Sequence, residues 1–209
     1  MERYLVFCAH ADDEIVGMGG ALSKYGKEGK DIITVIFSFG ERSQPHLKEE
    51  HVAKERVLES RKVDYLVGKE SIFLGLDEGK ILEQAEKFNV KDKIKMLIKK
   101  FKPNKIFTLS AYDPHKDHRD VNSIVVSAFD ELKYKGELYT FEVWNVVKEN
   151  NPAIFVDVSD TFKKKLKLLK RYKSQKLSIY LLWLPIYLRA RRYGNKTGCK
   201  YAEKLYKIR

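Results

Sequence analysis

The chain has 209 residues, a length that fits one domain and can bury a sizeable core. Its hydrophobic fraction of 44% excludes a disordered chain, which would lack the apolar content for such a core. The net charge of +12 points to an anionic partner (nucleic acid, a membrane surface or an acidic small substrate), unless the lysines only cover solvated helix faces.

Short apolar runs alternate with longer stretches of helical periodicity along the chain. Strands are expected at residues 4–9, 31–39, 71–76, 105–111, 138–144 and 153–158. Helices are expected at residues 16–26, 46–67, 88–101 and 119–132. Because the early strands are apolar on both faces, this order predicts an α/β fold. We expect a Rossmann-like, doubly wound, mostly parallel sheet with helices on both faces.

The last quarter of the chain predicts a helical segment. Ser159 or Asp160 is expected to cap a Lys-rich helix that runs to about residue 174. A second helix is expected at residues 177–192, followed by a loop and a short terminal helix. Since no repeat, low-complexity segment or linker interrupts the sequence, we expect a single domain over residues 1–209.

Cysteine usage and the amino-terminal segment predict a compartment. Cys8 and Cys199 are too few for a disulfide framework or a CxxC metal site, which suits a reducing environment. The stretch MERYLVFCAH lacks the basic region and long apolar run of a signal peptide. The longest apolar run, residues 179–188, is too short to span a bilayer and contains Pro185. We therefore expect a soluble, cytoplasmic protein.

The glycines of GMGGAL (residues 17–22) resemble a dinucleotide-binding fingerprint only superficially. Leu22 occupies the place of the third glycine, so the phosphate-binding turn cannot form. We expect no cofactor-binding residues there, and interpret the glycines as sites of close helix–sheet packing.

Two clusters of His and Asp each follow an expected strand. AHADDE (residues 9–14) follows the first strand, and YDPHKDHRDV (residues 112–121) follows the fourth. Because ligands bind beyond the carboxyl ends of the strands in an open α/β sheet, the two clusters should converge. His10, Asp13 and His118 would then offer two nitrogens and one oxygen and leave a position for water, the composition of a catalytic zinc site. A cation there would also offset the repulsion among the adjacent acids.

The same stretches resemble the motifs of a known family. AHADDE is similar to the A-H-P-D-D-E signature of the LmbE-like/PIG-L zinc-dependent N-acetylglucosamine deacetylases, and HKDH (residues 115–118) is similar to their H-P-D-H. Further similarity, in the family's order, covers FLGLDEGKI (73–81), FVDVSDTFKKKLKLLKRYKSQ (155–175) and RRYGNKTGCKYAEKLY (191–206). On these motifs the chain is identified as a member of that family.

The resemblance assigns the reacting groups. It implies that His10, Asp13 and His118 hold one zinc ion per subunit. Asp12 matches the general base, which takes a proton from the metal-bound water. His115 matches the residue that stabilises the oxyanion and assists as general acid.

The resemblance also implies supporting roles. Asp117 would orient one imidazole. Glu14 matches the last acid of the motif, and we expect a structural role for it, such as binding backbone amides at the start of the following helix. Ala11 and Lys116 replace prolines of the family's two motifs without touching a ligand.

Substrate-binding residues are expected around the metal site. Arg56 matches an Arg of the family, although a helix-surface ion pair is the alternative. In GLDEG, Glu78 stands where the family has Asp, with Asp77 just before it, so either acid could reach a sugar hydroxyl. Tyr112 is expected to line the pocket.

The implied reaction is removal of the acetyl group from a small molecule or oligosaccharide bearing N-acetylglucosamine. The alternatives are another metal-dependent amidase or phosphoesterase at the same site and a basic nucleic-acid-binding protein; we expect no nucleic-acid partner. The family often forms closed oligomers, so a homo-oligomer is expected, with residues 177–192 as the candidate contact. Packing in the core is an alternative for this stretch, and docking on an anionic membrane surface is a less favoured one.

Overall fold

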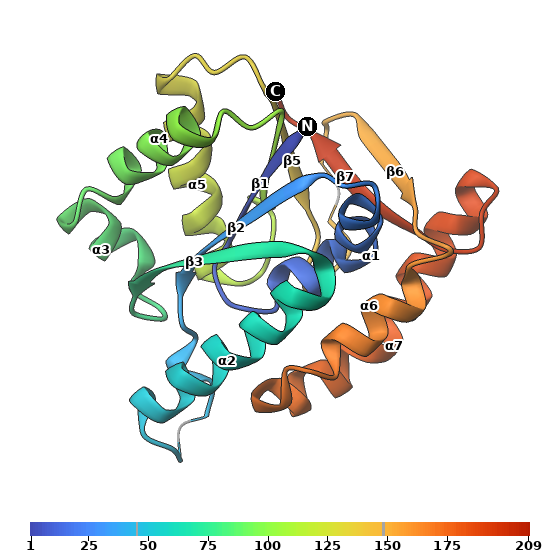
Figure 1. Cartoon of the computed structure of the whole chain (residues 1–209), viewed down its shortest axis with the longest axis horizontal. Coiled ribbons are helices and arrows are strands. Elements are labelled where there is room, and N and C mark those ends of the chain that lie inside the picture. The colour runs from blue at the N-terminus through green and yellow to red at the C-terminus, as the bar shows by residue number, and fades with distance from the viewer. Residues whose placement is uncertain (45, 148) are drawn as a thin grey trace.

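The computed structural model describes residues 1–44, 46–147 and 149–209. These residues form a seven-stranded sheet between two layers of helices (Figure 1). The strand order is β3-β2-β1-β4-β5-β7-β6. The strands are β1 (Arg3–Cys8), β2 (Asp31–Ser38), β3 (Lys69–Leu76), β4 (Lys105–Leu109), β5 (Glu137–Phe141), β6 (Ala153–Asp157) and β7 (Ala202–Lys207).

The sheet is mostly parallel, as expected. The strands from β3 to β5 all run in one direction, and β7 runs antiparallel to both of its neighbours. After β3 the chain returns to the other side of β1, so the direction of winding reverses between β1 and β4. Register places Val6 of β1 beside Phe107 of β4. Such a reversal opens a crevice at the carboxyl ends of the two strands.

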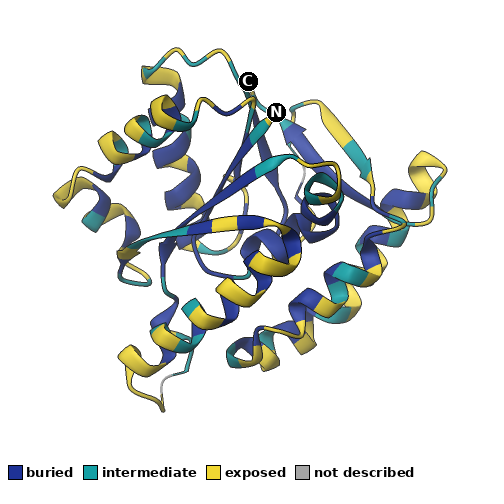
Figure 2. Ribbon diagram, in the orientation of Figure 1, coloured by how far each residue is buried: buried dark blue, intermediate teal, exposed yellow. Residues whose placement is uncertain are grey.

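Helices cover both faces of the sheet, which confirms the doubly wound prediction. α5 packs on β1 and β4 beside α3 and α4, whereas α1 packs on β1, β2 and β7 beside α2 and α6 (Figure 1). The central strands are buried and the outer helix faces are exposed (Figure 2). The helices are α1 (Asp13–Lys27), α2 (Glu49–Val67), α3 (Ile81–Lys87), α4 (Val90–Phe101), α5 (Lys116–Glu131), α6 (Phe162–Leu169) and α7 (Lys176–Thr197), with 3₁₀ turns at Glu41–Ser43 and Lys173–Gln175.

The glycines of α1 allow the helix to lie close against its neighbours. A Cβ at Gly17 would stand 2.4 Å from Cδ2 of Phe141, and one at Gly20 would stand 2.8 Å from Cβ of Val158. Both distances are too short for a side chain. The predicted close helix–sheet packing is therefore confirmed.

Helix α1 is interrupted at Met18, whose φ of −138° and ψ of 25° are not helical. Just beyond the kink, the carboxylate of Glu203 accepts hydrogen bonds from the backbone N–H groups of Gly20 (3.0 Å) and Ala21 (2.7 Å). Lys165 of α6 donates to the same carboxylate at 2.6 Å. The last strand thus caps the second half of the first helix.

The prediction of a short terminal helix is wrong, because residues 202–207 form β7. Lys and Glu have good helix propensity, so a segment rich in them was expected to be helical. Insertion between β5 and β6 overrides that propensity by burying the segment. The charges of the strand are paired instead of solvated: Lys204 pairs with Glu142 at 2.6 Å, and Glu203 pairs with Lys165.

Helix boundaries differ from the expectation in two other places. Helix α3 was not expected, and Asn89, with a left-handed φ of 53°, separates it from α4. The Lys-rich helix α6 begins after Thr161, so Ser159 and Asp160 are not its N-cap. It ends at Leu169, whereas α7 continues past its expected end. None of the described helices combines the length and apolar character needed to cross a bilayer.

Candidate metal centre

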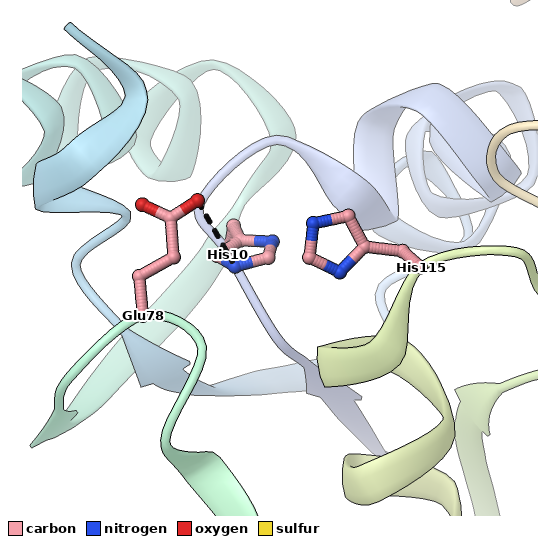
Figure 3. A group of neighbouring side chains, drawn as sticks. All are labelled: His10, Glu78 and His115. Atoms are coloured by element: carbon pink, nitrogen blue, oxygen red, sulfur yellow. Dashed lines mark ion pairs between the residues drawn. The ribbon is translucent and has the colours of Figure 1, made fainter. Parts of the chain in front are cut away.

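The two predicted clusters meet at the carboxyl edge of the sheet. His10 follows β1, and His115 to His118 follow β4 at the start of α5. A third segment, the loop after β3, brings Glu78 to the same place. Figure 3 shows the side chains of His10, Glu78 and His115 converging from these three segments. The expected convergence of segments far apart in the sequence is therefore confirmed.

Asp13 lies between two imidazoles. Its Oδ1 is 3.2 Å from Nε2 of His118, and its Oδ2 is 3.8 Å from Nδ1 of His10. All three side chains are buried, and one potential ligand atom from each lies within 4.8 Å of the others. Oδ2 of Asp13 also accepts a hydrogen bond from the backbone N–H of His10 at 2.8 Å, which fixes the carboxylate. The arrangement brings together the predicted set of two nitrogens and one oxygen.

A carboxylate also lies beside the other nitrogen of each imidazole. Oδ2 of Asp117 is 3.2 Å from Nε2 of His10 and accepts from the backbone N–H of Gly79 at 2.9 Å. Oδ1 of Asp113 is 3.0 Å from Nδ1 of His118. Such partners orient the imidazoles of metal sites. Asp117 was expected in this role; Asp113 was not, although its position two residues before His115 gave a weak signal.

The polar atoms of this group fit a cation. An ionised Asp117 can only accept a hydrogen bond, so Nε2 of His10 donates to it, whereas Nδ1 of His10 faces Asp13 at 3.8 Å, too far for a hydrogen bond. Neither ring nitrogen of the fully buried His118 makes a well-oriented hydrogen bond to the described residues. A lone pair facing a carboxylate is unfavourable unless a cation lies between them. Two imidazole nitrogens and a carboxylate oxygen suit Zn²⁺.

The buried charges shift one another's pKa values. Burial alone would raise the pKa of Asp13, but the imidazoles of His118 and His10 hold it well below its usual range. Burial lowers the pKa of His118, but the carboxylates of Asp13 and Asp113 outweigh this and raise it to about 10. Without a metal ion, a protonated His118 therefore offsets part of the negative charge of Asp13 and Asp113.

Asp12, which precedes Asp13, is held in a strained backbone conformation. Its φ of 154° lies outside the range that residues with a Cβ favour. Nη2 of Arg56 donates to Oδ1 of Asp12 at 3.0 Å and to the carbonyl of Ala11 at 3.0 Å. Burial raises the pKa of Asp12 to about 7, even though Arg56 opposes the shift. Because Arg56 is only 2% exposed, the alternative of a helix-surface ion pair is wrong.

His115 caps the amino terminus of α5. Its Nδ1 accepts a hydrogen bond from the backbone N–H of Asp117 at 3.2 Å, so a neutral ring carries its proton on Nε2. The ring centroid lies 5.1 Å from that of His10 and 4.8 Å from that of His118. Burial lowers the pKa of His115, and the two neighbouring imidazoles lower it further. The geometry thus presents a neutral hydrogen-bond donor beside His10 and His118.

Only one of the two acids in GLDEG faces the site. Oε1 of Glu78 lies 4.0 Å from Nε2 of His10, and its backbone N–H donates to Oε1 of Glu41 at 2.8 Å. The backbone N–H of Asp77 instead donates to Gln84 at 2.9 Å, and the Asp77 side chain does not line the cavity. The structure therefore places Glu78 where a ligand would bind.

A cavity of about 190 Å³ opens over these residues. His10, Asp12, Asp13, Arg56, Glu78 and His115 line it, as expected, but Tyr112 does not; Tyr112 is 61% exposed. Further lining residues that sequence reasoning missed are Ser43, Val143, Trp144, Gln175, Ser178 and Leu182. Gln175 ends the stretch 155–175, which resembles a motif of the family, so the sequence did offer a signal for this residue. The other five residues lie in no such motif.

Glu14 contacts another strand from the first turn of α1. Its carboxylate lies 3.3 Å from Nζ of Lys69, and both side chains are completely buried. Burial raises the pKa of Glu14, while the ammonium group of Lys69 opposes the rise. Lys69 also contacts Asp64. Glu14 thus anchors the first turn of α1 through a buried ion pair to β3, which is a structural role.

Comparison with solved structures shows the fold. The chain matches N,N'-diacetylchitobiose deacetylase from Pyrococcus horikoshii with a TM-score of 0.83 and 23% identity, over 99% of this chain and 84% of that one. It matches GalB, the 4-carboxy-2-hydroxymuconate hydratase of Pseudomonas putida KT2440, with a TM-score of 0.85 and 20% identity, over 100% and 97%. Since a deacetylase and a hydratase both share this fold, the fold alone does not determine the reaction.

Sequence comparison supplies the family. Diacetylchitobiose deacetylase of Thermococcus kodakarensis is 25% identical over 221 residues, which cover 97% of this chain and 82% of that protein. Residues 5–129 match the family model described as PIG-L: GlcNAc-PI de-N-acetylase. This match includes both His/Asp clusters and more than half of the chain, and it establishes that the chain belongs to the PIG-L family.

Proposed function

We propose that the chain is a zinc-dependent hydrolase that removes the N-acetyl group from a compound containing N-acetylglucosamine. The observation that carries the proposal is the buried group of His10, Asp13 and His118, with Asp12 beside it in the lining of the cavity. Family membership and the relatives described as deacetylases support the same reaction.

The residues of the site suggest how the reaction proceeds. A zinc ion held by His10, Asp13 and His118 would polarise the acetyl carbonyl and lower the pKa of a bound water. Asp12 takes a proton from the attacking water and passes it to the departing amine, and a pKa of about 7 suits both steps. Arg56 holds Oδ1 of Asp12, so the proton travels on Oδ2.

His115 acts on the other side of the acetyl group. Its Nε2–H donates to the oxygen on which negative charge develops. The backbone N–H of Asp117 fixes the required tautomer through Nδ1. Glu78, at the rim, is placed to accept a hydrogen bond from a sugar hydroxyl.

Acetate release from a panel of N-acetylglucosaminyl compounds tests the proposal. The panel contains neutral chito-oligosaccharides and compounds with an anionic aglycone, because a net charge of +12 favours anionic substrates. We expect release that a chelator abolishes and added zinc restores. Release that ignores the chelator, or no release from any compound, would contradict the proposal; reaction of neutral compounds alone would contradict the charge argument.

We further propose that α7 is the contact in a homo-oligomer. One face of the helix packs on the protein through Ile179 and Ile186, so part of the stretch belongs to the core. The opposite face exposes large apolar side chains at helical spacing: Leu177, Tyr180, Leu181, Leu184 and Leu188. Sedimentation should give more than one subunit, and a monomer at all concentrations would refute the contact.

A further inference from the structure

His10 presents its two ring nitrogens to two different groups of side chains. Nδ1 faces Asp13 at 3.8 Å, within the buried group described above. Nε2 has the fully buried Oδ2 of Asp117 at 3.2 Å and Oε1 of Glu78, which lines the cavity, at 4.0 Å. His10, Glu78 and His115 each offer a potential ligand atom, and these atoms lie within 4.8 Å of one another (Figure 3).

This outer group differs from the inner one in its access to solvent. The side chain of Glu78 is 21% exposed, compared with 5% for Asp13, and His115 is half-buried. The backbone on both sides of the Glu78 side chain is nevertheless fixed, because N–H of Glu78 donates to Glu41 (2.8 Å) and N–H of Gly79 donates to Asp117 (2.9 Å). The outer group is therefore both held in place and open to the cavity.

Charge favours a second cation here. One divalent ion and the guanidinium of Arg56 would supply three positive charges around the cavity. Five carboxylates lie beside these groups, so the ionised cluster keeps a net negative charge with one ion bound; they are Asp12, Asp13, Asp113, Asp117 and Glu78.

We propose that His10, Glu78 and His115 form a second, weaker divalent-cation site, and that its occupation blocks the substrate. This rests on the proposed function, since it assigns His115 and Glu78 to the reaction. The ion binds Nε2 of His10 in place of the proton now given to Asp117, and that proton leaves to solvent. An ion that accepts imidazole and carboxylate together, such as Zn²⁺, fits this set.

Geometry predicts the lower affinity. Ligand atoms at about 2.1 Å from a tetrahedral zinc ion lie about 3.4 Å apart. Oε1 of Glu78 and Nε2 of His10 are 4.0 Å apart, so the exposed carboxylate must move slightly inward. The second ion also shares an imidazole with the first and is repelled by it.

Titration of metal-stripped protein with zinc chloride, followed by calorimetry and elemental analysis, tests the site without any substrate. We expect two ions per chain, the second bound at least tenfold more weakly. Glu78→Gln should bind a single ion with the affinity of the first. Glu83→Gln, which removes an exposed carboxylate from α3, is the control and should still bind two.

A second variant guards against misfolding. His115→Asn keeps a side chain that can cap α5 and should also lose only the weaker ion. Saturation of the unaltered protein at one ion, or two ions bound by Glu78→Gln or His115→Asn, would overturn the second site.

Acetate release distinguishes a failure of the second site from a failure of the proposed function. Excess zinc should inhibit acetate release by the unaltered protein at least tenfold, whereas the residual activity of Glu78→Gln should not fall. A protein that binds one ion and releases acetate would refute the second site only. A protein that binds two ions and releases no acetate would refute the proposed function only.

Discussion

The buried group of charges around Glu203 and the one around Asp13, both beside α1, are built in opposite ways. Near the middle of the helix, both carboxylate oxygens of Glu203 accept hydrogen bonds, from the backbone of Gly20 and Ala21 and from Lys165. In the group at the amino terminus of α1, several buried polar atoms lack a hydrogen-bond partner in the part of the chain that the structure describes. Within the described residues, both ring nitrogens of His118 and one oxygen each of Asp113 and Asp117 make no well-oriented hydrogen bond.

The difference separates support from function. Leaving buried polar atoms unpaired destabilises a fold, and the group around Glu203 satisfies its own members, as suits a structural role. The group around Asp13 is incomplete on its own, as expected of a group that binds a ligand. Residue type alone does not distinguish the two, because both contain a buried carboxylate beside a cationic or titratable partner.

The largest expected effect is a loss of activity when Asp12, beside the group around Asp13, is replaced. Asp12→Asn keeps the shape of the side chain but cannot carry a proton, so turnover should fall by about 10²–10⁴-fold. Bound zinc per chain should stay unchanged in elemental analysis. Near-normal acetate release by this variant would remove Asp12 from the mechanism.

The next largest effect is a loss of stability when the group around Glu203 is disrupted. Glu203→Ala leaves Lys165 buried without its partner and uncaps the backbone of α1, which should lower the free energy of unfolding by about 3–5 kcal/mol. Urea denaturation measures the loss, and zinc affinity of the folded protein should hardly change. Glu131→Ala, which removes the surface partner of Lys91 and Lys95, is the control and should cost far less. A large loss of zinc affinity in Glu203→Ala would mean that the two groups are not independent.

A smaller effect concerns the residue that sequence reasoning undervalued. Asp113→Asn keeps a side chain beside Nδ1 of His118 but removes its charge, so zinc affinity should fall by about 10–100-fold. Competition with a coloured chelator measures this change. If affinity were unaltered, Asp113 would belong with the structural carboxylates.

The smallest effect is a dependence on pH. Because the pKa of His118 is raised to about 10 in the metal-free protein, zinc must displace a proton below that pH. Zinc affinity should therefore rise with pH, by up to about tenfold per unit for one displaced proton. Calorimetry in buffers with different ionisation enthalpies counts the protons released. Affinity that is flat between pH 6 and 8 would contradict a protonated His118.

Much of the fold and the centre of the site could be predicted from the sequence. Strands that are apolar on both faces indicated a parallel sheet, and the two clusters behind β1 and β4 needed only the rule that carboxyl ends meet at one edge. His10, Asp13 and His118 do come together. These features depend on local pattern and on a general property of such sheets.

What the sequence did not predict depends on distant contacts. The tail was expected to be helical because helix propensity depends on local sequence. Its burial between β5 and β6 depends on contacts with distant parts of the chain. Ser178 and Leu182 reach the cavity from α7, far along the chain, and no motif marks them. Glu14 reads as a helix-terminal acid because Lys69, its partner, lies on another strand.

The position of β7 has a consequence for how the chain folds during synthesis. β6 is made before β7, yet β7 is the strand that joins it to the rest of the sheet. Until β7 enters, β5 has an open edge and the backbone of α1 lacks its cap. Pairings this distant in sequence cost loop entropy and form slowly. A nascent chain that ends before β7 therefore exposes strand edges, and a chaperone that binds such edges would act on this intermediate.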